Sequence, residues 1–141
     1  MNILFYLTPK CECAYLEDTD SIRQAMEKME TKRYSTIPLL NSNGGYIGTI
    51  TEGDLLWHIK NHDDLDLHKA EHIRITEVDR RRDYMPISIN AKMENMIELA
   101  MKQNFVPVAD DDGSFIGIVT RQEIIKYFYG LTQTTESAES A

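Results

Sequence analysis

The chain has 141 residues, of which 42% are hydrophobic and 27% are charged, a balance typical of one ordinary globular domain or two very small ones. Its formal net charge of −8 disfavours both a nucleic-acid polymer and a membrane as partner, because an acidic surface repels phosphate backbones and anionic lipids. The apolar segment 2–7 is too short to cross a bilayer and lacks a basic flank, so we expect a cytoplasmic protein.

The first half of the chain predicts a strand, a helix, two strands and a second helix. A short strand is expected around residues 13–16, and Thr19 then caps a helix. The apolar residues of that helix recur at helical spacing: Ile22, Ala25, Met26 and Met29. A strand that carries Pro38 follows, and after a polar turn the β-branched run 46–51 forms the next strand. Thr51 opens the last helix of this half.

All four histidines fall between His58 and His72. His58 and His62 are four residues apart, as are His68 and His72, so each pair shares one helix face, an arrangement that zinc can use. The competing interpretation is a polar helix end and a linker between two units. We favour the linker and predict no metal, because a closed site would require the chain to fold back on itself.

The second half repeats the same order of elements. A strand is expected at 86–89, followed by a helix that Asn90 caps. The apolar residues of this helix are Met93, Met96, Ile97 and Ala100. A strand with Pro107 comes next, and the β-branched run 115–120 leads into the helix that Thr120 opens.

The two halves are an internal duplication, since residues 46–56 read "YIGTITEGDLL" and residues 115–125 read "FIGIVTRQEII". The predicted fold class is α/β (α+β), with two pseudo-symmetric β-α-β-β-α repeats, one in 1–62 and one after a linker in 63–130. Residues 131–141 are polar without periodicity, which predicts a disordered tail. A unit of this size is marginal alone, so we expect the copies to pack together with two equivalent clefts.

A threonine followed three residues later by an acid begins the last helix of each copy, as Thr51 with Asp54 and Thr120 with Glu123. Such a pattern is a helix capping box, and capping alone explains it. Each preceding strand, however, contains a glycine, and each neighbouring strand contains a proline. Both weaken a sheet and neither helps a cap, but both suit a cleft beside a helix N-terminus.

In such a cleft, the carboxylate of Asp54 is able to accept hydrogen bonds from both hydroxyls of a ribose, and the helix N-terminus suits a phosphate. Ile37 and Ile47 would sandwich a base, whose edge would pair with the peptide groups of Ile37 and Leu39 beside Pro38. The pattern therefore favours a nucleotide as the ligand.

With "IPLL…YIGTITEGDLL" and "VPVA…FIGIVTRQEII", residues 3–130 closely resemble a tandem pair of cystathionine-beta-synthase (CBS) domains, a Bateman module. The resemblance implies a regulatory sensor of an adenosine ligand, among which AMP, ADP, ATP, S-adenosylmethionine, NAD-type molecules and cyclic di-AMP are known for the family. It also implies a homodimer that pairs face to face.

Carried over residue by residue, Thr51 and Asp54 match the family's ribose-contacting pair. Thr120 matches in the second copy, whereas Glu123 replaces the usual aspartate and lengthens the side chain by one methylene. The predicted base-contacting strands and their glycine comprise Ile37, Pro38, Gly48, Val106 and Pro107.

Basic residues near the clefts are the expected phosphate ligands. Arg121 stands at a helix N-terminus, where a cation is otherwise unfavourable. The others lie in loops 8–12 and 79–85, which family members place beside the nucleotide: Lys10, Arg80, Arg81 and Arg82. The alternative is a solvated charge run, partly neutralised by neighbouring aspartates.

The chain contains no P-loop, no G-x-S-x-G, no H-E-x-x-H and no G-x-G-x-x-G, so we predict that it is not an enzyme and needs no catalytic cofactor. The expected function is adenine-nucleotide sensing that orders loops 8–12 and 79–85 and signals to an unknown protein target in trans. Two alternatives remain open: a structural or interaction module with empty clefts, and a metal-responsive protein that uses the His58–His72 cluster.

Overall fold

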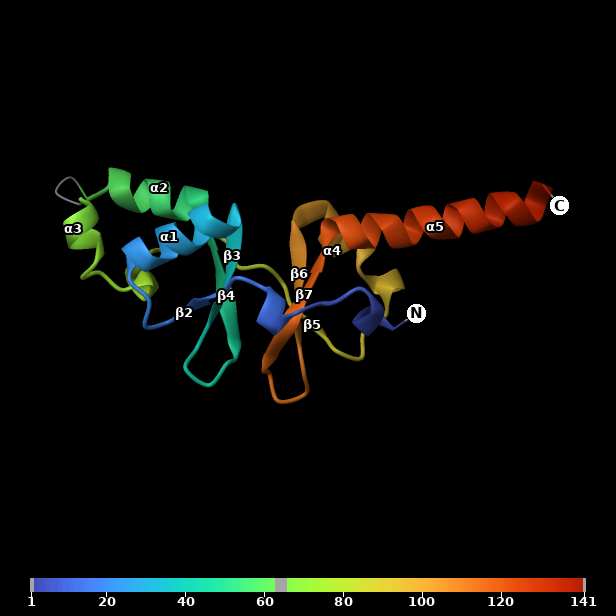
Figure 1. Cartoon of the computed structure of the whole chain (residues 1–141), viewed down its shortest axis with the longest axis horizontal. Coiled ribbons are helices and arrows are strands. Elements are labelled where there is room, and N and C mark those ends of the chain that lie inside the picture. Colours follow the sequence, from blue (N-terminus) through green and yellow to red (C-terminus); the bar gives the residue numbers. More distant parts are fainter. Residues whose placement is uncertain (1, 63–65, 141) are drawn as a thin grey trace.

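The computed structural model describes residues 2–62 and 66–140, which form two halves of the same construction (Figure 1). The repeat elements of the first half are β2 (Leu16–Glu17), α1 (Ile22–Lys32), β3 (Thr36–Leu40), β4 (Tyr46–Thr51) and α2 (Glu52–Lys60). Those of the second half are β5 (Ile87–Ser88), α4 (Ile97–Lys102), β6 (Phe105–Ala109), β7 (Phe115–Thr120) and α5 (Arg121–Ser140). Each half has the predicted order β-α-β-β-α, and the predicted fold class is confirmed.

Further short elements lie between and before the repeats. They are β1 (Thr8–Pro9), α3 (Leu67–Ala70) and four 3-10 turns at Ile3–Phe5, Lys10–Glu12, Ile75–Glu77 and Met93–Asn95. Among the described residues no helix combines the length and the apolar character needed to cross a membrane.

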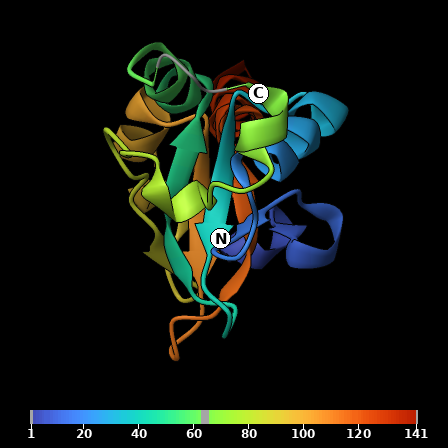
Figure 2. The ribbon, with the colours of Figure 1, turned by 90° about the vertical axis from the view of Figure 1, so that its left-hand side faces the viewer.

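The strands form two sheets, one with the order β2-β3-β4 and one with the order β1-β7-β6-β5. The sheets lie next to each other at the centre of the molecule, with α1 and α2 beside the first sheet and α4 and α5 beside the second (Figures 1 and 2). Between the sheets a mixed cluster of buried residues draws on both halves: Leu40, Phe105, Phe115 and Ile118. The two halves are therefore one packed body, as their marginal size predicts.

The duplication extends to the irregularities of the backbone. Pro38 lies opposite Thr49 in the first hairpin, and Pro107 lies opposite Ile118 in the second. Both hairpins shift register one residue beyond the same glycine pairing, between Leu39 and Leu40 and between Val108 and Ala109. Proline donates no ladder hydrogen bond, and a register shift follows it in each hairpin. The two hairpins are therefore irregular at equivalent positions.

Each half completes the core of the other. Ile3 is fully buried in the second core together with Met93 and Met96, and β1 pairs antiparallel with β7. Conversely, Ile75 and Val78 belong to the first core. The packing therefore crosses the predicted division between the repeats at residue 62.

Two helix starts differ from the sequence prediction. Ser21 caps α1 in place of Thr19: its hydroxyl accepts from the Gln24 N–H at 3.1 Å, and the Gln24 side chain accepts from the Ser21 N–H at 2.8 Å. This reciprocal pair satisfies two N-terminal donors, which outweighs a lone hydroxyl two residues earlier. In the second half Asn90 caps nothing, because a 3-10 turn precedes α4, which begins only at Ile97 without a side-chain cap.

The C-terminal end also differs from the prediction of a disordered tail from residue 131. α5 continues to Ser140 and projects beyond the second half (Figure 1). Neither proline nor glycine follows Gly130, and each residue added to an established helix gains one backbone hydrogen bond, so polar composition alone does not end the helix. Residue 141 lies outside the described residues.

Candidate functional site

The N-terminus of α2 holds the predicted threonine–aspartate pair in a complete capping box. Thr51 Oγ1 accepts from the Asp54 N–H at 3.0 Å, and Asp54 Oδ2 accepts from the Thr51 N–H at 3.0 Å. The other carboxylate oxygen, Oδ1, accepts from the backbone N–H of Arg81 at 3.2 Å. Asp54 is only 3% exposed, and its carboxylate accepts hydrogen bonds from two backbone N–H groups in this largely desolvated position.

The segment 80–84 of the second half lies directly across β4 of the first half. Asp83 Oδ1 accepts from the Thr49 N–H at 3.1 Å, and the Tyr84 N–H donates to Thr49 Oγ1 at 3.0 Å. The Tyr46 hydroxyl donates to the carbonyl of Tyr84 at 2.5 Å. The loop predicted to border the cleft is therefore brought to Asp54 and covers the strand that leads to it.

Gly48 is needed because of this close approach. A Cβ at residue 48 would lie 2.3 Å from Asp83 Oδ1 and 2.8 Å from Arg80 Nε. A glycine within a strand permits such a close approach, and its presence here suggested a cleft. What approaches in the structure is the chain's own segment 80–84.

The three arginines of this segment have different surroundings. Arg80 donates to Asp83 Oδ1 at 2.8 Å, which neutralises it as the charge-run interpretation expected. The guanidinium of Arg81 lies 5.1 Å from the centroid of the Trp57 ring, a cation–π contact beside Asp54. Arg82 is exposed. Arg81 is thus the arginine placed beside the predicted ribose-binding carboxylate.

Asp54 and Arg81 line a hollow of about 270 Å³ together with Trp57, His58, Asn61, His62 and Asp79. The sequence had not predicted histidines in a nucleotide cleft. The signal was available, because residues 54, 58 and 62 recur at a spacing of four, which places Asp54 and His58 on one face of α2 and His62 just beyond its end. The hollow combines an aromatic ring, a guanidinium and two imidazoles, groups that suit a base and a phosphate.

His58 is the perturbed titratable group of this hollow. Burial and the neighbouring His62 lower its pKa from 6.5, and Asp79 and Glu77 partly oppose this. Its Nε2 is buried, without a hydrogen-bond partner among the described residues. The folded protein therefore favours the neutral imidazole.

We expect His58 to make the protein less stable in mild acid. In the unfolded chain His58 binds a proton near its ordinary pKa of 6.5, but in the folded chain it does so only at lower pH. Stability present above that ordinary pKa is thus lost as the pH falls toward the folded pKa. His58→Gln should reduce the fall of the melting temperature between about pH 7.5 and 5.5, whereas His72→Gln, at an exposed position, should not. An unchanged pH dependence in His58→Gln would contradict this assignment.

The second copy lacks an equivalent arrangement. Thr120 Oγ1 accepts from the Glu123 N–H at 3.2 Å, but a Glu123 carboxylate oxygen lies 3.8 Å from Lys126 Nζ. Arg121, a predicted phosphate ligand, makes contacts with the protein itself. Its Nε donates to the carbonyls of Ala100 at 2.7 Å and Gln103 at 3.1 Å, so it caps the C-terminal end of α4.

Lys10 lies over the ring of Tyr15, and the residues of the predicted base-contacting strands are buried. Lys10 Nζ lies 5.2 Å from the ring centroid of Tyr15. Ile37 and Val106 are fully buried in the two cores, so their side chains do not face a cleft. The reason is that β3 and β6 are the central strands of their sheets and both of their faces are covered. Pro38 and Pro107 lie in these strands and are also buried.

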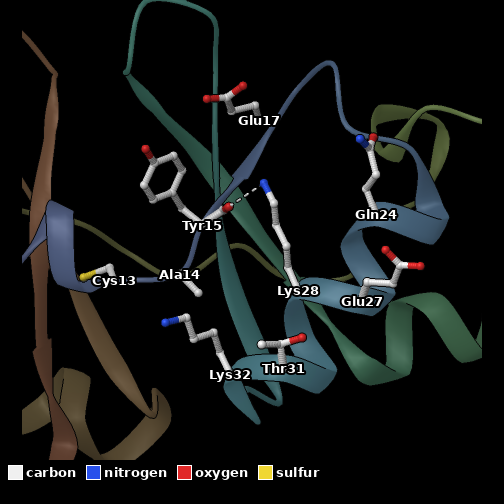
Figure 3. Close-up of a pocket in the computed structure, with 9 residues that line it drawn as sticks. All are labelled: Cys13, Ala14, Tyr15, Glu17, Gln24, Glu27, Lys28, Thr31 and Lys32. Atoms are coloured by element: carbon white, nitrogen blue, oxygen red, sulfur yellow. Dashed lines mark hydrogen bonds between the residues drawn. The ribbon is translucent and has the colours of Figure 1, made fainter.

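A wider groove of about 580 Å³ runs between residues 13–17 and α1 (Figure 3), and none of the predicted ligand residues is among those that line it. Lys28 Nζ donates to the Tyr15 carbonyl at 3.3 Å and to Asp20 Oδ2 at 2.9 Å, which protects this edge of the sheet. Burial raises the pKa of the Cys13 thiol to about 11, so Cys13 is a poor nucleophile. The groove therefore lacks the polar arrangement found at Asp54.

A family model described as "CBS domain" matches residues 7–61 and 75–130. An uncharacterized protein of Methanocaldococcus jannaschii, MJ1426, is 28% identical, with 78% of this chain and 82% of that protein covered. The A-adding tRNA nucleotidyltransferase of Aquifex aeolicus is also 28% identical over 79% of this chain, but the chain spans only 12% of that enzyme's length. A solved structure of CbpB in complex with c-di-AMP superposes with a TM-score of 0.82 at 24% identity, covering 98% of this chain and 91% of CbpB.

Proposed function

The chain belongs to the CBS-domain family, and from this premise we propose that it is a regulatory module that senses an adenine nucleotide, of the AMP, ADP, ATP or cyclic di-AMP class. The proposed site is the first-half cleft at Thr51 and Asp54. The observation that supports it is the buried Asp54 carboxylate, which lies at a helix N-terminus and accepts a hydrogen bond from the segment 80–84.

The proposed mechanism is an exchange of hydrogen-bond donors on Asp54. Oδ2 is engaged within the capping box, whereas Oδ1 accepts from the Arg81 N–H at the longer distance of 3.2 Å. Ribose hydroxyls would take the place of that N–H on Oδ1, with Thr51 Oγ1 as a further partner for the sugar or its phosphate. Ligand binding would thereby move the segment 80–84.

The first cleft is the proposed principal site. Arg81 supplies positive charge for a phosphate there, the two histidines supply ring nitrogens for hydrogen bonds, and Trp57 supplies an aromatic face. In the second half Glu123 faces Lys126 and Arg121 caps α4. We therefore propose stronger binding in the first cleft than in the second. The cyclic di-AMP complex of CbpB has the same fold, which supports this ligand class for the module.

A protein target would bind the moved segment in trans. The module would act as a homodimer, and its role would be regulatory and not catalytic. Apolar side chains exposed on the paired helices of each half support a self-association surface: Leu56, Ile59, Ile97, Met101 and Ile125. A ligand shifts this assembly only by its difference in affinity between the two arrangements of the segment.

A panel of ligands tests the proposal. Melting temperatures would be measured with AMP, ADP, ATP, cyclic di-AMP, S-adenosylmethionine and NADH, with GTP as the control for the base. At a concentration 100 times Kd, a bound ligand stabilises the fold by about 2.7 kcal/mol, which such a scan detects readily. An equal response to GTP, or no response to any adenosine compound at millimolar concentration, would contradict the proposal and favour a structural module with empty clefts.

A further inference from the structure

The helical turn at residues 66–72, in the connection between the halves, presents three metal-binding side chains on one surface. Asp66 caps α3, since its Oδ1 accepts from the Lys69 N–H at 2.8 Å. Ala70 is 2% exposed and belongs to the first core, so it anchors the turn on the body of the protein. The backbone that carries His68 and His72 is therefore fixed at its start and on its buried side.

The donor atoms of His68, Glu71 and His72 gather on the exposed side of this turn. One ligand atom from each residue lies within 4.8 Å of the other two. The two imidazole rings are 5.4 Å apart, centroid to centroid, and Glu71 Oε2 lies 3.9 Å from His68 Nδ1. Two ligands of one tetrahedral zinc ion lie roughly 3.4 Å apart, given metal–ligand bonds of about 2.05 Å, so small rotations of exposed side chains suffice.

Glu71 is held in a suitable orientation by α1. Its Oε1 contacts the guanidinium of Arg23, while Oε2 is the oxygen directed toward His68. A carboxylate has lone pairs on both oxygens, so the arginine and a cation are able to share it. The Arg23 contact therefore orients the third ligand without occupying its metal-binding oxygen.

We propose that His68, Glu71 and His72 form a binding site for a divalent transition-metal ion, with Zn²⁺ as its best ligand. Two imidazoles and one carboxylate suit zinc, copper and nickel, whereas Mg²⁺ and Ca²⁺ select oxygen ligands alone. Three protein ligands leave the fourth zinc position to water or to a ligand from another molecule. The site is independent of the nucleotide cleft proposed above.

The second histidine pair does not form such a group. The rings of His58 and His62 are stacked at 4.0 Å, and His62 Nδ1 lies 2.7 Å from the carbonyl oxygen of His58. Within the described residues, His68, Glu71 and His72 are the one group of three or more ligand-type side chains close enough to share an ion. His58 and His62 therefore provide the matched control, with the same residue types at the same spacing.

Bound metal would stabilise the turn at residues 66–72 beside α1. The residues that follow the site join α1 through the Ile22 N–H, which donates to the Ile73 carbonyl at 2.9 Å, and through a bridge between Ser21 and Arg74. An ion on His68, Glu71 and His72 adds a further link within this region, next to the Arg23 contact. We expect zinc to raise the melting temperature, and this gain to require both His68 and His72.

Isothermal titration of the EDTA-treated full chain with ZnCl₂ tests the site, and Co²⁺ absorption spectra report the ligand set. We expect one zinc per chain and at least a tenfold weaker Kd in His68→Ala and His72→Ala. The double variant His58→Ala/His62→Ala should bind as tightly as the original chain. Arg23→Gln should keep binding, which separates the metal site from the ion pair.

Two results would overturn the proposal. One is the absence of binding at 100 µM zinc, and the other is equal binding in the double variant His68→Ala/His72→Ala. Circular dichroism of each variant distinguishes a lost site from a lost fold. Because no nucleotide is present in the titration, its outcome does not depend on the nucleotide proposal.

Discussion

Asp54→Ala is expected to weaken adenine-nucleotide binding by roughly 10- to 150-fold, since a lost hydrogen bond to a charged acceptor costs about 1.5–3 kcal/mol and 1.4 kcal/mol is a factor of ten. The ribose hydroxyls would lose a buried, ionised acceptor. The substitution also leaves the N–H groups of Thr51 and Arg81 without Asp54, so the variant should be less stable even without ligand. Titration calorimetry on protein that circular dichroism shows to be folded measures the effect.

The duplication supplies the matched control for this variant. Glu123→Ala removes the equivalent acid of the second half, and we expect it to change the same Kd by less than about threefold, which is below 1 kcal/mol. Arg81→Ala keeps the backbone N–H on Asp54 and tests the guanidinium alone. Equal losses in Asp54→Ala and Glu123→Ala would refute the assignment of the first cleft as the principal site.

Gly117→Ala is expected to lower the free energy of unfolding by about 2–4 kcal/mol, the range of a severe backbone clash combined with strain. A Cβ at this residue would lie 2.2 Å from the backbone carbonyl oxygen of Thr8 and 3.1 Å from Pro9 Cα. The φ angle of +155° also disfavours a side chain. Since the neighbour is backbone, β1 has to move away from β7. Urea unfolding measures the loss.

Gly130→Ala is the control for Gly117→Ala. Gly130 lies within α5, where a Cβ would meet nothing within 4 Å, so alanine should be neutral or stabilise by up to about 1 kcal/mol. Gly48→Ala should be milder than Gly117→Ala, because the atoms it meets belong to the movable side chains of Asp83 and Arg80. If Gly117→Ala were as stable as the original chain, the close approach of β1 would be wrong.

Most of the fold was predictable because of the duplication. Hydrophobic periodicity and turn residues occur in both copies, so the element assigned in one copy supports the element assigned in the other. The proline strands, the strands that contain glycine and the helix start at Thr51 follow from local patterns, and the structure has them where these patterns place them. The exact start of α1 and the length of α5 were not predicted. Ser21 rather than Thr19 caps α1 because a reciprocal bond with Gln24 is available, and polar composition did not reveal that α5 continues.

The candidate site was predictable only where one element carries it. Thr51 and Asp54 share one helix turn, so their spacing determines their geometry. The orientation of Ile37 depends on which faces of β3 are covered, and the environment of Arg121 depends on the distant end of α4. The local sequence around Gly48 also did not reveal what lies beside it, because segment 80–84 comes from the other half of the chain.

The pairing of β1 with β7 bears on the order in which the chain folds. Thr8 lies opposite Ile118, so β1 finds its partner only when β7, far along the chain, is in place. Until then Ile3, which is fully buried in the finished protein, has no second core to enter. Completion of the second core therefore depends on a contact between segments far apart in the sequence, the kind of contact that slows folding.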